Sequence, residues 1–423
     1  MTPTTATAPF PILARVLIAG AGIMSLANSV TIPFLAVFLR KDLGLEPGMI
    51  GFIIGSSVFF SIFAGFVGGS LSDLLGRTRL LVVSLLGVMG SFLGLYFSDG
   101  VLAVFVFNAT LALSSSSFAP VGKALLSDLL PQERRAKTFS YQYMATNMGY
   151  AVGPVVGAAV GLAGGRAAFL AGAVGYGLYL VGLVAVLRLA SVAAAGRPGG
   201  GDAGKQHFGS VLRGLADSAR IVAIDRRLLF LILAGLLLEA VHGRISSLLA
   251  QYLSVGFTDG VTILGYVLAT NAVTVVVLQV FVSRFMVKRN PVTSITVGGL
   301  LTVAGMVGFA VAGNVWHFIV AMVVFSLGEV LIYPAEFAII DRIAPEESRG
   351  AYFGAQTFAQ IGVFIGPFTG GLLLGAYGGT TMFLGVGLFA LASVIIYLLV
   401  GRRVPGLAGD ASIVKKEQSD ELA

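Results

Sequence analysis

The sequence predicts an all-α membrane protein in which twelve transmembrane helices form two pseudo-symmetric six-helix bundles. Three observations lead to this: a strongly apolar composition, about twelve apolar segments long enough to span a membrane, and a repeat that relates the two halves. Hydrophobic residues make up 57% of the 423 residues and charged residues 11%, whereas soluble domains are about a quarter charged. The 57 glycines are typical of membrane helices that pack closely.

A transmembrane helix needs about 20 mainly apolar residues, and segments of this kind recur along the whole chain. They lie at 14–39, 48–72, 80–98, 101–127, 138–162, 167–188, 228–253, 260–283, 292–313, 316–341, 350–376 and 379–401. We expect residues 1–188 to form the N-terminal bundle and 228–403 the C-terminal bundle. Residues 189–227 form a cytoplasmic linker that contains an amphipathic surface helix from Phe208 onward. The polar residues 404–423 form a cytoplasmic tail.

Basic residues set the expected orientation, because cytoplasmic loops carry an excess of Lys and Arg. With both termini in the cytoplasm, 22 of the 27 basic residues lie on the inner side and three on the outer side, while Lys123 and Arg244 fall inside spans. We therefore expect a multi-pass protein of the inner, cytoplasmic membrane. The net charge of +7 is assigned to loops that face anionic lipid rather than to nucleic-acid binding. The N-terminal stretch lacks the basic region of a signal peptide, so no cleaved signal is expected.

The sequence carries no pattern that favours an enzyme. It has no cysteine, which excludes disulfides and thiolate chemistry. We find no phosphate-binding loop, metal-ligand cluster or nucleophile triad, so we expect no catalytic residues, no metal and no cofactor. A small-molecule ligand and a single working chain are expected instead.

The two halves of the chain repeat one another. The segment 129–158, LLPQERRAKTFSYQYMATNMGYAVGPVVGA, is similar to 342–371, RIAPEESRGAYFGAQTFAQIGVFIGPFTGG. A six-plus-six duplication around a long central loop is typical of secondary transporters, which bind substrate near the membrane midplane between the repeats. A duplicated scaffold without transport remains the alternative at this point.

The short loop between the second and third spans carries a cluster of glycines and charges. Its residues are Gly69, Asp73, Gly76, Arg77 and Arg79. The cluster resembles the loop signature of the major facilitator superfamily, although Leu74 stands where the family often has a basic residue. The resemblance implies a conformational latch in which Arg77 reaches Asp73 and Asp128 and holds the two halves in the outward-facing state. The alternative is a simple positive-inside anchor.

A second motif lies in the fifth span and is repeated in the eleventh. Its residues are Gly149, Gly153, Pro154 and Gly157, repeated as Gly362, Gly366 and Pro367. The first copy resembles the superfamily motif that is typical of antiporters, especially drug:proton exporters. Glycines four residues apart make a smooth helix face, and proline bends the helix, so the motif suits a gate. The alternative is generic close packing of helices.

Ionisable groups inside the spans are candidates for proton coupling, since a charge at that depth is costly. Glu239 in the seventh span and Glu329 in the tenth lie near the midplane, and His242 and Arg244 follow Glu239 closely. A carboxyl group in a medium of low dielectric can hold a proton near neutral pH, so Glu239 or Glu329 would carry the coupled proton. The alternative is a static structural network within the C-terminal half.

Uncharged polar residues in the spans are candidates for the lining of a substrate cavity. They are Asn28, Tyr143, Asn147, Asn271, Gln356 and Gln360. Each of them also fits a role in joining helices by hydrogen bonds. Exporters of the family often carry an arginine in the fourth span, near Asn108 of this chain. Asn108 cannot carry a charge, so that part of the family's proton machinery is absent or rebuilt here.

The resemblance implies the fold and function of a twelve-helix drug:proton antiporter. We therefore expect a secondary active transporter that exports small hydrophobic or cationic compounds by alternating access, with the proton gradient as its energy source. Two alternatives stay open. The chain could carry a sugar, peptide, metabolite or lipid by symport or uniport, or it could be a sensor of the same fold that does not transport.

Overall fold

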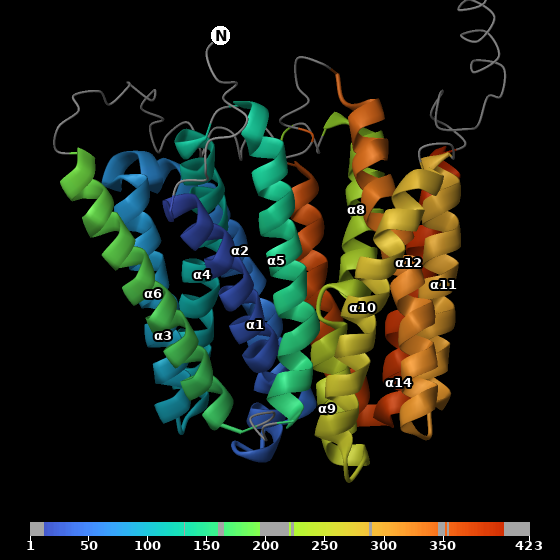
Figure 1. The fold of residues 1–423 in the computed structure, drawn as a ribbon. Helices are drawn as coiled ribbons and strands as arrows, with labels where there is room; N and C mark the ends of the chain where they lie inside the picture. The colour runs from blue at the N-terminus through green and yellow to red at the C-terminus, as the bar shows by residue number, and fades with distance from the viewer. Residues whose placement is uncertain are drawn as a thin grey trace, which may run out of the picture. The chain divides into compact units, whose positions relative to one another are not determined.

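The computed structural model describes residues 12–130, 132–159, 165–194, 220, 224–286, 290–345, 352 and 355–401. The regular elements within these ranges are all helices (Figure 1). The predicted all-α membrane fold is therefore confirmed.

The first six predicted spans each correspond to one helix. These are α1 (Ile12–Lys41), α2 (Pro47–Leu75), α3 (Arg77–Phe97), α4 (Val101–Leu129), α5 (Gln132–Ala159) and α6 (Ala167–Ala194). The predicted bounds of the spans fall within a few residues of most helix ends and differ by up to six. The two largest differences are at the start of α5, where a polar first turn precedes the apolar run, and at the end of α6, which continues beyond Arg188.

The C-terminal helices depart from the predicted spans at two places. They are α8 (Arg226–His242), α9 (Ile245–Gly256), α10 (Gly260–Met286), α11 (Pro291–Val311), α12 (Val315–Ile343), the 3₁₀ helix η3 (Thr357–Ile361) and α14 (Gly362–Gly401). The seventh span, expected as one helix, is broken between α8 and α9. The last two spans are continuous in α14 but divide at Gly378, whose φ of 82° lies in the region that only glycine adopts easily.

Ten segments of the described helices are long and apolar enough to cross a membrane by length and composition. One of them, Thr357–Gly401, has 45 residues, or about 68 Å at 1.5 Å per residue, which is enough for two crossings. With α5 and the division at Gly378, each of the twelve predicted spans has a helical counterpart.

Polar side chains cap the first turn of several C-terminal helices. The Asp225 carboxylate accepts a hydrogen bond from the Arg227 backbone N–H at 2.8 Å, and Asn290 accepts one from Val292 at 2.9 Å ahead of α11. Such caps satisfy backbone donors that have no partner within the helix. They fix where the membrane helices begin at the polar boundary.

The helices group into two compact units. One contains the described residues up to Ala194 together with 244–272 and 367–376, and the other contains the remaining described residues. In the first unit α1 packs against α5, α6 and α9, and α3 packs against α4 and α6. In the second unit α11 packs along α12, and α8 contacts η3. The domain bounds expected from the sequence stay a prediction.

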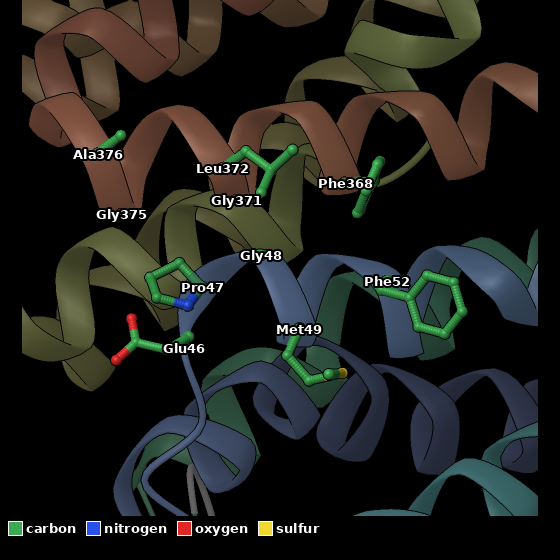
Figure 2. Close-up of a pocket in the computed structure, with 10 residues that line it drawn as sticks. All are labelled: Glu46, Pro47, Gly48, Met49, Phe52, Phe368, Gly371, Leu372, Gly375 and Ala376. Atoms are coloured by element: carbon green, nitrogen blue, oxygen red, sulfur yellow. The ribbon is translucent and has the colours of Figure 1, made fainter.

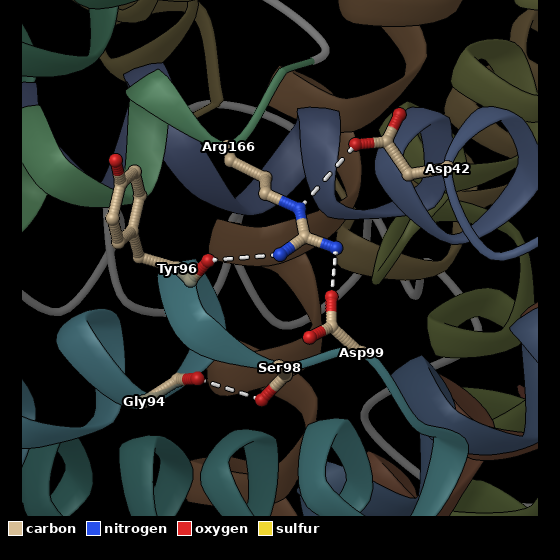
Figure 3. A network of polar contacts seen from close by, with 6 residues as sticks. All are labelled: Asp42, Gly94, Tyr96, Ser98, Asp99 and Arg166. Carbon is tan, nitrogen blue, oxygen red and sulfur yellow. Dashed lines mark hydrogen bonds and ion pairs between the residues drawn. The ribbon is translucent and has the colours of Figure 1, made fainter.

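An arginine joins three segments at one end of the first unit (Figure 3). The Arg166 guanidinium lies 2.6 Å from an Asp99 carboxylate oxygen and 3.8 Å from Asp42, and it also donates to the Tyr96 carbonyl. It lies over the Phe38 ring at 5.5 Å. Arg166 is one of the three basic residues predicted to face outward, so this network marks the end of the unit that is predicted to face outward.

Candidate functional site

Three carboxyl groups come together within the second unit. Glu239 of α8 receives a hydrogen bond from Tyr333 of α12, and its charge interacts with those of Glu329 and Glu336. Glu329, Tyr333 and Glu336 follow at intervals of four and three residues, so they share one face of α12. Tyr333 is within electrostatic range of all three acids. We call Glu239, Glu329 and Glu336 the acidic cluster.

Glu336 is the most buried member of the acidic cluster, with 6% of its surface exposed. The Tyr397 hydroxyl of α14 donates a 2.8 Å hydrogen bond to its carboxylate. Glu336 and Tyr397 also line a small internal cavity that Gln356 reaches. The cluster therefore links α8 to α12, and the bond from Tyr397 connects it to α14. It includes two of the residues predicted to couple protons, Glu239 and Glu329.

His242 contacts α11 and α12, and it shares one neighbour with Glu239, because its ring lies 6.2 Å from that of Tyr333. Its Nδ1 lies 3.1 Å from the Leu238 carbonyl oxygen, which can only accept, and its Nε2 lies 3.1 Å from the Thr302 hydroxyl. Its ring packs 4.8 Å from that of Phe325. The histidine thus joins α8 to α11 and α12, beside the acidic cluster.

Arg244 stands at the break in the seventh span and belongs to the first unit. Its charge interacts with Tyr150 of α5. Of the four residues predicted for proton coupling, the structure therefore brings Glu239 and Glu329 into one cluster in the second unit, and Arg244 has Tyr150 as a neighbour in the first.

The glycine motifs form matching helix contacts in the two units. A Cβ atom added at Gly153 would overlap the Ser29 hydroxyl of α1, and one added at Gly149 would lie 2.5 Å from the Gly22 carbonyl oxygen. In the second unit a Cβ at Gly362 would overlap the Leu236 carbonyl oxygen of α8. The fifth span thus packs on the first as the eleventh packs on the seventh, which is the arrangement that the repeat predicts.

The remaining motif residues have similar surroundings. A Cβ at Gly157 would lie 3.2 Å from Val30, and one at Gly366 would overlap the Ala240 carbonyl oxygen. Pro154 lies inside α5 and Pro367 inside α14, where neither interrupts the helix. These contacts fit both a gate and tight packing, so the gating role stays a prediction.

The loop motif between the second and third spans is described only in part. Gly76 has φ 86° and separates α2 from α3. Arg77 is the first residue of α3 and is partly buried. The side chains of Asp73 and Asp128 lie outside the described residues, as does the side-chain environment of Gly69, so the latch contacts stay a prediction.

The polar residues predicted to line a cavity divide between the units. Asn28 accepts a 3.0 Å hydrogen bond from Tyr176, and Asn147 and Asn271 are partly buried in α5 and α10. In the second unit Gln356 is partly buried and Gln360 is exposed. The Tyr143 side chain lies outside the described residues. Asn28 thus joins α1 to α6. The prediction that these six polar residues line a substrate cavity stays a prediction.

Asn108 has a structural partner. Its side-chain amide donates a 2.8 Å hydrogen bond to the Ile53 carbonyl oxygen, and only 7% of the residue is exposed. The residue at the position of the family's arginine therefore ties α4 to α2.

A groove of about 730 Å³ opens between α2 and α14 in the first unit (Figure 2). Its lining is apolar, with Phe52, Phe368 and Leu372 among its residues and Glu46 as its only charged side chain. A groove with one carboxylate at its end offers little chemistry for coupling, so we place the candidate site at the buried polar groups instead.

Sequence reasoning missed the tyrosines and two polar residues of α9. Tyr333 and Tyr397 supply hydrogen bonds to the acidic cluster, and Ser247 and Gln251 are buried polar residues beside Arg244. The spacing of Tyr333 from Glu329 and Glu336 is a signal that could have found it. Nothing in the sequence pairs Tyr397 with Glu336.

Comparison with known proteins identifies the family to which the chain belongs. A family model described as Major Facilitator Superfamily matches residues 17–360 and, in a second match, 313–419. The chain belongs to the major facilitator superfamily. It is therefore a multi-pass membrane protein of a transporter family, and the predicted fold is that of its relatives.

Several relatives resemble the chain over most of its length. The MFS-type transporter YqjV of Bacillus subtilis (strain 168), whose function is uncharacterised, is 31% identical over 84% of each chain. A Na(+), Li(+), K(+)/H(+) antiporter of Planococcus maritimus is 26% identical over 91% of this chain and 94% of its own. The quinolone resistance protein NorA of Staphylococcus aureus (strain MSSA476) is 23% identical over 88% and 92%.

Among solved structures, the nucleoside transporter NupG superposes with a TM-score of 0.78. The sequence identity is 11%, and the alignment covers 92% of this chain and 99% of NupG. At that identity the likeness shows a shared fold alone.

Proposed function

We propose that the protein exports small, largely apolar organic compounds in exchange for protons, by alternating access. The observation that carries the proposal is the acidic cluster, in which Glu239 and Glu329 interact at membrane depth. Neighbouring carboxylates repel one another strongly in a medium of low dielectric, so such a cluster takes up and releases protons as its surroundings change.

The relatives support this direction of transport. One is a cation/H(+) antiporter and another is a quinolone resistance protein. The glycine contacts of α5 on α1 and of α14 on α8 add support, because smooth helix faces allow the small movements between helices that alternating access needs.

The experiment uses the purified protein in liposomes that contain a pH-sensitive dye. We impose a proton gradient and add ethidium, benzalkonium, a sugar and a dipeptide in turn. The proposal predicts that an apolar or cationic compound triggers proton movement opposite to its own, and that a protonophore abolishes the signal. Proton movement in the same direction as the sugar or the dipeptide would contradict export and indicate symport. If none of the compounds triggers proton movement, the proposal is contradicted.

A further inference from the structure

The break in the seventh span places a helix N-terminus deep in the membrane. Gly243 and Arg244 form a turn between α8 and α9, and no side chain caps the start of α9. Arg244 lies twelve residues before the end of α9 at Gly256, or roughly 18 Å at 1.5 Å per residue. The N-terminal end of a helix carries partial positive charge and therefore favours an anion.

Polar atoms on α9 and on the residue before it are buried without a hydrogen-bond partner among the described residues. They are Arg244 Nε, Ser247 Oγ and both polar atoms of the Gln251 amide. Ser247 is fully buried and Gln251 is 2% exposed. Other buried serines donate to a carbonyl one turn back, as Ser326 does to Met322 at 2.7 Å. The polar atoms of α9 are thus left for a partner that does not belong to the described protein.

Two of these side chains share one face of α9, and the third stands at its start. Ser247 and Gln251 lie four residues apart on the helix, and Arg244 is the N-cap residue three positions before Ser247. Tyr150 of α5 lies within electrostatic range of Arg244. Tyr150 lies three residues after Asn147, so it continues the face of α5 that carries a predicted cavity residue.

Arg244 has no carboxylate partner in the described part of the chain. Arg166, at the end of the same unit, is by contrast paired with Asp42 and Asp99. A guanidinium group buried at membrane depth is costly without a counter-ion. Its planar donors match the two oxygens of a carboxylate.

We propose that Arg244, Ser247 and Gln251 form a subsite for a carboxylate, or a comparable anionic group, on the transported compound. Arg244 supplies the charge, while the Ser247 hydroxyl and the Gln251 amide donate further hydrogen bonds. This inference rests on the proposed function, and it narrows the hydrophobic or cationic class implied by the family resemblance to compounds that also carry an anionic group.

Equilibrium binding tests the subsite without requiring transport. The full-length protein in detergent is titrated with benzoate and 2-naphthoate, each matched by its neutral amide at constant ionic strength, and the melting temperature is recorded. A ligand that binds only the folded state raises that temperature in a saturable way. We expect saturation with the carboxylates and none with the amides.

Variants of α9 assign the effect to the subsite. Arg244→Gln should weaken the apparent carboxylate affinity at least tenfold, and Gln251→Leu should weaken it less. Arg226→Gln, at an exposed position of the same span, is the matched control and should leave the affinity unchanged. If Arg244→Gln does not fold, Arg244→Lys and Ser247→Ala take its place, and both should weaken binding.

The proposal is overturned if neither carboxylate gives a saturable shift, or if the Arg244 and Gln251 variants bind as the wild type does. Failure of the two proposals is distinguishable. Carboxylate binding without any coupled proton movement would contradict proton exchange alone. Proton movement that is unaffected by the Arg244 and Gln251 variants would contradict the subsite alone.

Discussion

At the residue scale, the acidic cluster depends on hydroxyl groups as much as on carboxyl groups. Tyr333 bonds Glu239, and Tyr397 bonds Glu336 from a distant part of the sequence. The acids could be picked out from the sequence because charges are rare in apolar spans. Their partners could not, because tyrosine is common in membrane helices and its partner is set by how the helices pack.

The bond between Tyr397 and Glu336 makes a testable contribution to stability. Tyr397→Phe removes the donor and leaves a buried carboxyl oxygen without it, which costs about 1–3 kcal/mol. We expect a lower melting temperature in detergent. Tyr377→Phe is the matched control, because Tyr377 lies on the same helix and is 72% exposed. Equal melting temperatures for the two variants would contradict a structural contribution of this bond.

Gly76 offers a second test at this scale. Its φ of 86° is strained for any residue with a side chain, so Gly76→Ala should cost about 1–3 kcal/mol although nothing lies near an added Cβ. Gly90→Ala, inside α3 and also in open space, should instead be neutral or mildly stabilising. Thermal unfolding of both variants measures the difference, and similar stabilities would show that the turn tolerates a side chain.

At the element scale, the repeated glycine motif packs each copy on the equivalent helix of its own half, α5 on α1 and α14 on α8. The sequence predicts a smooth helix face in each half, because glycines four residues apart recur, but it does not name the partner helices. It does not predict the break between α8 and α9, since Glu239, His242 and Arg244 interrupt the apolar run without a proline to mark a helix end.

The contact of α14 on α8 can be tested with one added methyl group. Gly366→Ala would place a Cβ against the Ala240 carbonyl oxygen and force the helices apart, at a cost of about 1–3 kcal/mol. We expect both the melting temperature and the transport rate to fall. Gly182→Ala in α6, where a Cβ meets nothing within 4 Å, is the control and should keep both. Wild-type transport and stability in the Gly366 variant would mean that the helices do not need this close approach.

At the scale of the whole molecule, the sequence alone is sufficient to predict the fold and the family. Apolar length, the distribution of basic residues and the internal repeat each act over the entire chain, so local errors in helix ends do not change the result. The site was only partly predictable. Glu239 and Glu329 could be singled out as rare charges in apolar spans, whereas their grouping with Glu336 and Tyr333 depends on how α8 and α12 pack.

The central claim is that Glu239 and Glu329 carry the coupled proton, and one comparison tests it most directly. Glu239→Gln and Glu329→Gln are reconstituted beside Glu46→Gln, which changes an exposed carboxylate before α2. Proton movement triggered by the transported compound is measured together with exchange of that compound across the membrane without a gradient. We predict that the first two variants lose proton movement while keeping at least part of the exchange, and that the third keeps both. Full proton coupling in Glu239→Gln and Glu329→Gln would contradict the account.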